Sequence, residues 1–297
     1  MSPTASSPGS PEVITPSLLR DWALPATGSS KYGKGQVLVV GGARNTPGAA
    51  MLAGQAALRV GAGRLVLAVA GSVAAQVAVA VPECATAALD ENAHGSVLGS
   101  ALQGIASELS TADVVVVGSG LDDADETSAL VAALSDAVGE ETAVVLDAYA
   151  LGILPQVADR VAALRGRLVL TPNMAEIARL AERDEVTEDE LPEVVPDVAA
   201  RFGAVVTCHN VIADPDGHLW QNSAGHGGLG TSGSGDVLAG AIGGLLARGA
   251  TPAQAACWGT YLHAAAGDRL AALVGPTGFL AGELLARIPN VLVELSV

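Results

Sequence analysis

The sequence contains few aromatic residues, few lysines and few cysteines, and each shortage excludes a class of protein. Phe, Trp and Tyr make up 3% of the 297 residues although half of the chain is hydrophobic, so small aliphatic side chains must form the core. The three cysteines, Cys84, Cys208 and Cys257, are odd in number and far apart. This spacing argues against a disulfide framework and against a cysteine-based metal site, and we predict reduced thiols and a cytoplasmic location.

Basic residues are also scarce, because 15 Lys and Arg face 31 Asp and Glu, for a net charge of −16. The negative electrostatic field of this net charge repels nucleic acids and anionic membranes, so neither is an expected partner. The only lysines, Lys31 and Lys34, precede the first predicted strand, which excludes a P-loop of the form GxxxxGK[ST]. Every hydrophobic run ends before about 18 residues, and we predict neither a signal peptide nor a membrane span.

Short hydrophobic runs alternate with longer Ala-rich segments along most of the chain. The Pro- and Ser-rich start predicts a disordered tail over residues 1–14, with one domain over residues 15–297. Thr15 and Pro16 suit the first positions of a short helix. Strands are predicted within residues 36–42, 64–69, 113–120, 143–148, 167–172 and 204–208. Because these runs are hydrophobic throughout, they indicate an α/β fold whose mainly parallel sheet is covered by helices on both faces.

Four of the predicted strands end in small or polar residues, in the segments VVGG, VVGSG, LDAY and LTPN. Open α/β sheets bind their ligands outside the carboxyl ends of their strands. The side chains at these ends are therefore candidates for a pocket.

A glycine-rich segment, GTSGSGD from Gly230 to Asp236, precedes a helix predicted to begin close to Gly235. The N–H groups of a helix's first turn have no intrahelical partner, and glycines let a ligand approach the backbone, so Thr231, Gly233, Ser234 and Gly235 suit an anion cradle. Asp236 could cap the helix. It could also be the base that accepts the proton of an acceptor hydroxyl during phosphoryl transfer, with Mg²⁺ and amides neutralising the phosphate.

These motifs resemble those of the ADP- or ATP-dependent NAD(P)H-hydrate dehydratases, a family within the ribokinase-like superfamily. The similarity runs in order from about Thr15 to Ala286 and includes KYGKGQVLVVGG, GAGRLVLAV, LTPNMAEIARL, VIADPDG, GTSGSGDVLAGAIGGLLARG and LHAAAG. The resemblance implies a three-layer α/β/α ribokinase-like fold, usually in a homo-oligomer. It also implies an enzyme that phosphorylates the added hydroxyl of hydrated NADH or NADPH with ADP or ATP and eliminates the phosphate.

The resemblance implies roles for individual positions of this sequence. Asp236 matches the residue that acts on the substrate hydroxyl, and Gly235 matches a nucleotide-contacting glycine. Ala49, Gly120 and Asn173 match residues of the substrate pocket. The segment that lies along the nucleotide corresponds here to Cys208, His209 and Asn210. No residue is expected to be a dedicated metal ligand.

The sequence departs from the family at several of these places. It has Asn173 where the family has histidine, Ser119 where it has proline, Tyr149 where an aspartate is usual, and no lysine in the segment TCHN. Our leading hypothesis is an ADP-dependent dehydratase domain without a fused epimerase domain. A small-molecule kinase of the same superfamily and a catalytically silent nucleotide-binding protein stay open as alternatives.

Overall fold

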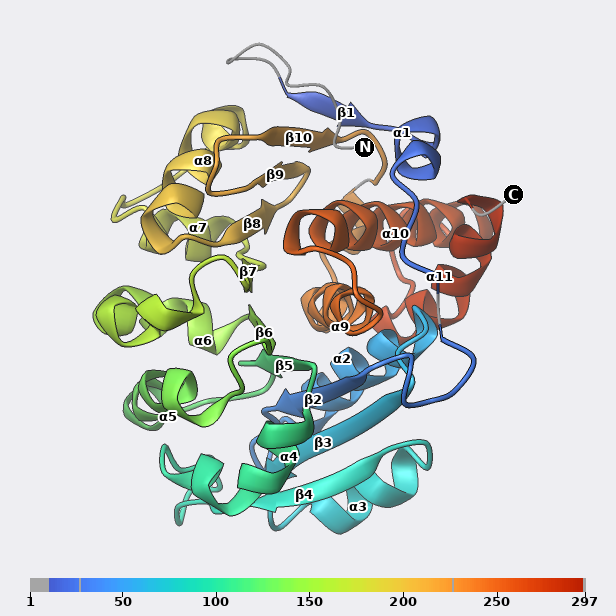
Figure 1. Ribbon diagram of the computed structural model, residues 1–297. Helices are drawn as coiled ribbons and strands as arrows, with labels where there is room; N and C mark the ends of the chain where they lie inside the picture. The colour runs from blue at the N-terminus through green and yellow to red at the C-terminus, as the bar shows by residue number, and fades with distance from the viewer. Residues whose placement is uncertain (1–10, 27, 226, 296–297) are drawn as a thin grey trace.

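A ten-stranded sheet forms the middle layer of the computed structural model, which describes residues 11–26, 28–225 and 227–295 (Figure 1). Its strand order is β1 (Glu12–Ile14), β10 (Leu219–Asn222), β9 (Val211–Ala213), β8 (Val205–Cys208), β7 (Leu168–Leu170), β6 (Ala143–Leu146), β5 (Val114–Val117), β2 (Gln36–Val40), β3 (Arg64–Ala70) and β4 (Ala85–Leu89). All strands from β8 to β4 are parallel, whereas β9 is antiparallel to both of its neighbours. The predicted, mainly parallel sheet is confirmed.

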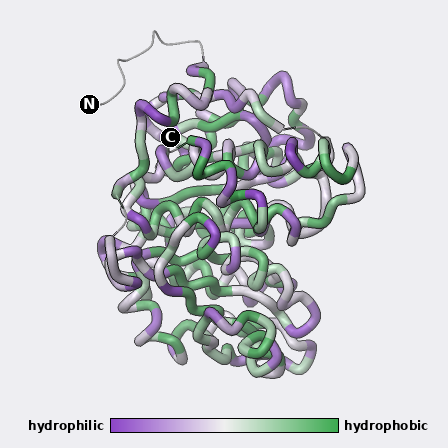
Figure 2. The backbone as a smooth tube through the Cα atoms, turned by 90° about the vertical axis from the view of Figure 1, so that its right-hand side faces the viewer, coloured by the Kyte–Doolittle hydropathy of each residue, from purple (hydrophilic) through white to green (hydrophobic). Residues whose placement is uncertain are grey.

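Helices cover both faces of this sheet (Figure 1). One face carries α1 (Pro16–Asp21), α2 (Pro47–Arg59), α3 (Ala74–Ala80), α9 (Ser234–Ala247), α10 (Pro252–Leu273) and α11 (Ala281–Leu295). The other carries α4 (Ala106–Thr111), α5 (Ala124–Ala137), α6 (Tyr149–Ile153), α7 (Met174–Leu180) and α8 (Leu191–Phe202), with the short 3-10 segments η1 (Ala101–Ile105) and η2 (Leu154–Leu164). Each face has its own hydrophobic core, and hydrophobic stretches alternate with hydrophilic connections along the chain (Figure 2). The three-layer α/β/α architecture is therefore also confirmed.

The glycines of α9 allow this helix to pack backbone to backbone against α2. A Cβ added at Gly240 would lie 1.9 Å from the carbonyl oxygen of Ala53, and one at Gly244 would lie 2.5 Å from that of Ala57. On another side of α9, a Cβ at Gly243 would lie 2.6 Å from Val116 of β5. Since these contacts leave no room for side chains, they fix α9, and with it Asp236, relative to the sheet.

The predicted N-terminal tail is too long by at least three residues. Glu12–Ile14 form β1, which pairs in parallel with β10, and Ile14 is completely buried. The indole nitrogen of Trp220 donates to the carboxylate of Glu12 over 3.2 Å. Composition alone missed this strand because its partner lies about 200 residues further along the chain. Residues 1–10 of the predicted tail lie outside the described residues.

Other elements were not predicted, including strands β4 and β10 and the C-terminal helix α11. Strand β4 has the sequence ATAAL, and its buried and exposed positions follow no simple alternation. Its placement depends on pairing with β3. No helix in the described part of the chain is long and apolar enough to cross a membrane.

Candidate active site

The strand order of the sheet reverses between β2 and β5, the two central parallel strands. From β2 the chain moves outward through β3 and β4, and from β5 it moves the opposite way through β6, β7 and β8. The two loops that leave β2 and β5 are joined by hydrogen bonds from Gly42 N to Ser119 O (2.9 Å) and from Ala43 N to Gly120 O (2.8 Å). Open α/β sheets bind ligands at such a switch point, outside the carboxyl ends of the strands.

A cavity of about 730 Å³ opens at the opposite, amino-terminal edge of the sheet and is lined in part by Asp113, Glu140 and Arg167. Ligands of open α/β sheets do not bind at that edge. The polar side chains described next instead gather at the carboxyl edge, so we place the candidate site there.

The N-terminus of α9 brings the predicted anion cradle to this edge. Gly233 is the N-cap, with a φ of 88°, and Asp236 lies in the first turn of the helix. A Cβ added at Gly235 would meet no atom within 4 Å, and Gly235 is exposed. The space in front of the first turn is thus open, and helix N–H groups at such a place favour a phosphate.

Ala49 and Gly120, both predicted to contact the substrate, lie against each other. A Cβ at Gly120 would lie 3.1 Å from the Cβ of Ala49 and 2.4 Å from the carbonyl oxygen of Thr46. Gly120 has a φ of 75°, and its carbonyl oxygen accepts a hydrogen bond from the hydroxyl of Thr46 over 2.7 Å. The loop after β5 therefore packs on the first turn of α2 with no space for a side chain between them.

Two carboxyl groups, those of Asp147 and Asp236, face the same serine. Asp147 directly follows β6 and is 4% exposed. Its Oδ2 lies 3.2 Å from the hydroxyl of Ser119, and its Oδ1 accepts a hydrogen bond from the hydroxyl of Thr171 over 2.7 Å. Ser119 also acts on the half-buried Asp236, whose pKa it lowers. Hydrogen bonds thus connect the residues that follow β7, β6 and β5.

Burial perturbs both acids, and repulsion by Asp236 further perturbs Asp147. Burial raises the pKa of Asp236, and the hydrogen bond from Ser119 partly offsets that rise. Burial, followed by the negative charge of Asp236, raises the pKa of Asp147 to about 7, although hydrogen bonds from Thr171 and Ser119 act in the opposite direction. Titratable groups whose environments separate their protonation in this way are typical of acid–base sites.

Asn173 is exposed and caps α7, the helix that follows β7. Its Oδ1 accepts a hydrogen bond from Glu176 N over 3.0 Å, and the carboxylate of Glu176 accepts from Asn173 N over 2.9 Å. This capping box occupies the side-chain oxygen of Asn173. The predicted substrate contact would thus depend on its amide nitrogen. Burial raises the pKa of Glu176, whose charge also acts on Asp147.

The predicted nucleotide contacts differ in what the structure leaves accessible. The hydroxyl of Ser234 is buried and hydrogen-bonds to His263 Nε2 over 2.9 Å, so only its backbone could meet a nucleotide. Cys208 is completely buried at the end of β8. His209 and Asn210 are exposed in the turn between β8 and β9, where His209 has a φ of 52° and its Nδ1 lies 3.5 Å from Glu188 Oε1. Thr231 is half-buried, and its carbonyl oxygen accepts from Ser234 N over 3.2 Å.

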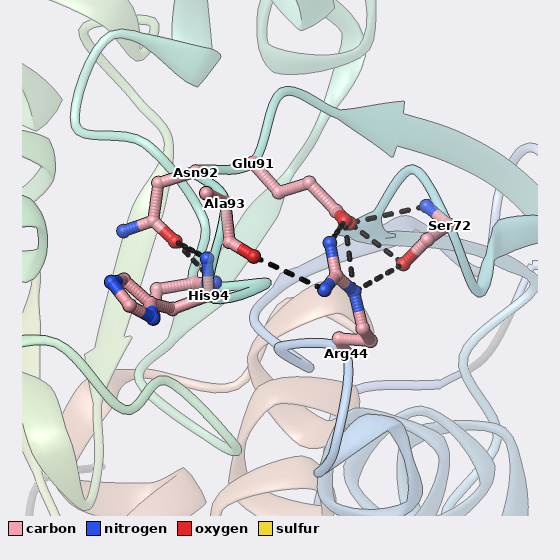
Figure 3. A network of polar contacts seen from close by, with 7 residues as sticks. Arg44, Ser72, Glu91, Asn92, Ala93 and His94 are labelled. Carbon is pink, nitrogen blue, oxygen red and sulfur yellow. Dashed lines mark hydrogen bonds and ion pairs between the residues drawn. The ribbon is translucent and has the colours of Figure 1, made fainter.

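A polar network fixes the loop that flanks the site on the side of β2 (Figure 3). The guanidinium of Arg44 forms an ion pair with Glu91 and also reaches the hydroxyl of Ser72 over 3.3 Å. This hydrogen-bonded ion pair lowers the pKa of Glu91. Arg44 N donates to Gly95 O over 2.9 Å, and Asn92 Oδ1 accepts from His94 N over 2.9 Å. The loop after β2 is thereby tied to the segment after β4.

No group of three or more His, Cys, Asp or Glu side chains in the described residues is arranged to hold a metal ion. Mg²⁺ keeps several waters and is usually bound through one or two carboxylates together with substrate phosphates. The residues present therefore fit a Mg²⁺ that arrives on a nucleotide better than one held in a preformed protein site.

Sequence reasoning did not select Asp147 and Thr171 as site residues. Both follow predicted strands in the segments LDAY and LTPN, so a signal was present in their position at strand ends. The structure adds that the carboxylate of Asp147 accepts hydrogen bonds from both Thr171 and Ser119. Ala148, the next residue, has a φ of 49° and a ψ of −118°, a conformation that costs energy for any residue other than glycine.

Comparisons with known proteins extend over most of the chain. A family model described as NAD(P)H-hydrate dehydratase matches residues 37–290. The chain is 42% identical over 288 residues to the ADP-dependent (S)-NAD(P)H-hydrate dehydratase of Xanthomonas campestris pv. campestris, covering 95% of this chain and 96% of that relative.

Longer relatives match over part of their length. The chain is 39% identical over 266 residues to the bifunctional NAD(P)H-hydrate repair enzyme Nnr of Moorella thermoacetica, covering 88% of this chain and only 50% of that enzyme. Among solved structures, the ADP/ATP-dependent NAD(P)H-hydrate dehydratase of Bacillus subtilis, co-crystallized with ATP/Mg²⁺, is similar with a TM-score of 0.77 and 27% identity. The superposition covers 96% of this chain and 98% of that one.

Proposed function

The chain belongs to the NAD(P)H-hydrate dehydratase family, and from this membership we propose that it is an ADP-dependent dehydratase that restores NADH and NADPH from their hydrated forms. The resemblance seen in the sequence motifs is thereby confirmed. ADP is preferred to ATP in this proposal because the Xanthomonas relative, which the chain matches nearly from end to end, is ADP-dependent.

The observation that carries the proposal is the position of Asp236, in the first turn of α9 beside an open, glycine-lined space at the carboxyl edge of the sheet. A base must lie near the acceptor hydroxyl, and phosphate must lie near unpaired N–H groups. The first turn of α9 provides both. Burial raises the pKa of Asp236, which makes its carboxylate a stronger base than an exposed one.

The proposed reaction has two steps. In the first, Asp236 accepts the proton of the added hydroxyl, whose oxygen bonds to the β-phosphorus of ADP while the bond from that phosphorus to the bridging oxygen breaks and AMP leaves. In the second, the C–O bond of the phosphate ester breaks, the ring loses a proton, and inorganic phosphate and the intact dihydronicotinamide are released. Mg²⁺ bound to the phosphates would neutralise charge as it develops.

The chain's own residues would position the reactants. The first turn of α9 would bind the phosphates through its backbone, and Ala49 with Gly120 would leave room for the nicotinamide ring beside Asp236. Because Gly120 packs directly on Ala49 and on the backbone of Thr46, this wall of the pocket has little freedom to move. Such rigidity suits the alignment of a hydroxyl with a phosphoryl group.

The decisive experiment is to incubate the protein with hydrated NADH, ADP and Mg²⁺ and to follow nicotinamide absorbance. Recovery of the absorbance with stoichiometric release of AMP and phosphate supports the proposal. Phosphate retained on a stable product would indicate a small-molecule kinase, and ADP binding without turnover would indicate a catalytically silent protein. The same assay with hydrated NADPH and with ATP would measure the preferences.

Asp236→Asn tests the proposed base, because the amide keeps the shape of the side chain and loses its basicity. We expect turnover at saturating substrate to fall by about 10²- to 10⁴-fold. Asp125→Asn is the matched control, since Asp125 is an exposed acid in the first turn of another helix, α5. Near-normal turnover of Asp236→Asn would reduce Asp236 to a helix cap, because asparagine caps about as well as aspartate.

A homo-oligomer and a cytoplasmic location remain predictions for this chain. Sedimentation at micromolar concentration would measure the first, and fractionation of the source cells would test the second.

A further inference from the structure

Ser234 is the buried residue of the glycine-rich segment that leads into α9. Its neighbours Gly233 and Gly235 have no side chains, and within residues 230–236 Ser234 alone is buried. Its hydroxyl lies 2.9 Å from Nε2 of His263, a residue of α10 that is 8% exposed. Because both groups are buried, removing either one leaves the other without its hydrogen-bond partner. The first turn of α9 is thus joined by a side chain to α10.

Helix α10 lies beside α9 and also contacts the chain that leads into it (Figure 1). Gly225 N donates to Asp268 Oδ2 over 2.9 Å. A Cβ added at Gly267 would lie 2.6 Å from Leu229, so this part of the chain packs closely on the helix. His263 and Gly267 are four residues apart and therefore lie on one face of α10. The same face of α10 supports both the approach to α9 and its first turn.

We propose that His263 is a positioning residue for the anion cradle, because its hydrogen bond to Ser234 fixes the first turn of α9 in the conformation that binds the phosphates of the nucleotide. This inference rests on the proposed function, since it takes that turn as the phosphate site. His263 acts through Ser234, and no contact between His263 and the nucleotide is assigned.

A glycine-rich segment needs such support, because glycine loses more conformational freedom on ordering than any other residue. Without the contact to His263, the nucleotide itself would have to order the first turn. The apparent affinity of a ligand falls in proportion to the fraction of molecules in the binding-competent conformation. At saturating nucleotide the turn is ordered in either case. The contact should therefore lower the KM for ADP and leave kcat nearly unchanged.

His263 contributes through geometry rather than charge. Burial lowers the pKa of His263 to about 4, so the ring is neutral near pH 7 and adds no positive charge to the phosphate site. Either partner can donate, depending on which ring nitrogen carries the proton. A neutral glutamine, whose amide also donates and accepts, can therefore replace the histidine in this role.

Three variants test the contact between the two side chains. His263→Phe keeps a planar ring and removes the hydrogen bond, and Ser234→Ala removes the other partner. We expect each to raise the KM for ADP by about five- to tenfold and to change kcat by less than about twofold. His263→Gln should keep the KM of the unchanged protein. A KM for ADP that is unchanged in folded His263→Phe, or equally raised in His263→Gln, overturns the inference.

The double variant separates a shared contact from two independent effects. Ser234→Ala combined with His263→Phe should raise the KM for ADP no more than either change alone, because both remove the same hydrogen bond. Effects that multiply would contradict the proposal.

Thr260→Val is the matched control for loss of a buried hydrogen bond on the same helix. Thr260 lies about one turn before His263, and its buried hydroxyl is 2.8 Å from that of Thr207 in β8. This change should lower stability and leave the KM for ADP as it is. A merely structural role of His263 would give His263→Phe the same behaviour as Thr260→Val.

Amide hydrogen exchange over residues 230–240 measures the same support without substrate or nucleotide. We expect faster exchange in His263→Phe and Ser234→Ala, and the rate of the unchanged protein in His263→Gln and Thr260→Val. Equal exchange in all of these proteins refutes the inference, even if the protein shows no dehydratase activity. Failure of the unchanged protein to bind and use ADP counts against the proposed function instead.

Discussion

Replacing Asp147 with asparagine should stabilise the fold, and increasingly so as the pH rises. Asp147 has its pKa raised from 3.8 to about 7 in the folded protein, mainly by burial. A raised carboxyl pKa means that the folded state keeps a proton that the unfolded state has released. Stability is therefore lost as the pH increases from about 4 to 7, and the full penalty persists above that range.

The size of the effect follows from the shift. About three pKa units correspond to a full penalty of about 4 kcal/mol in the free energy of unfolding. Linkage gives a penalty of about 2 kcal/mol at pH 5.5 and about 4 kcal/mol at pH 8.5, so the advantage of Asp147→Asn should grow by about 2 kcal/mol across that interval. Asparagine can still accept from Thr171 and donate to Ser119, so both hydrogen bonds are kept.

Urea unfolding of both proteins at several values between pH 5.5 and 8.5 would measure this difference while avoiding the isoelectric point near 4.5. His263 contributes with the opposite sign, because burial lowers its pKa to about 4, and its stabilisation is lost as the pH falls from about 6.5 toward 4. Both proteins contain His263, so its effect cancels in the comparison. A difference in unfolding free energy that does not change with pH would show that the pKa of Asp147 is not raised in the folded protein.

Two further predictions concern the glycines of the cradle and the cysteines. Gly235→Val should fold normally yet lose ADP binding in a calorimetric titration, because its Cβ would enter open space without a strained φ. Gly233→Val should instead lower the melting temperature, since Gly233 has a φ of 88° and a Cβ there would lie 2.6 Å from Leu52. Unchanged affinity in folded Gly235→Val would place the nucleotide elsewhere. A triple Cys→Ala variant should keep full turnover, because burial raises the pKa of all three thiols and keeps them protonated. Turnover that falls without a loss of stability would assign a role to the segment TCHN.

Much of the fold could be predicted because its strands are hydrophobic on both faces and its helices are bounded by local signals. The hydrophobic runs that form β2, β3, β5, β6, β7 and β8 could be identified without knowing which strands they pair with. The hydrogen bond from Leu18 N to the hydroxyl of Thr15 confirms a helix cap that was predicted from neighbouring residues. Strands β1, β4 and β10 could not be predicted in the same way. Each is short or mixed in burial and depends on a neighbour elsewhere in the chain.

The same distinction between local patterns and tertiary contacts applies to the candidate site. The start of a helix near Gly235, with Asp236 in its first turn, was predictable because a glycine-rich approach to a helix is a local pattern, whereas the binding and catalytic roles of these residues stay predictions. His263 lies in the interior, where it hydrogen-bonds to Ser234. The contacts among Ser119, Asp147 and Thr171 were not predictable, because these residues follow three different strands.

The sequence by itself determined the α/β class, the family and the glycine-rich start of α9, since these depend on residue types in a fixed order along the chain. The tertiary structure decided which strand ends meet, that the buried carboxyl group of Asp147 feels the charge of Asp236, and that Asp147 hydrogen-bonds to Ser119 and Thr171. The physical reason is that burial and electrostatic repulsion depend on distances between residues far apart in sequence. Ser119, Asp147 and Asp236 are neighbours only because parallel strands deliver their carboxyl ends to one edge of the sheet and α9 packs with its first turn against that edge.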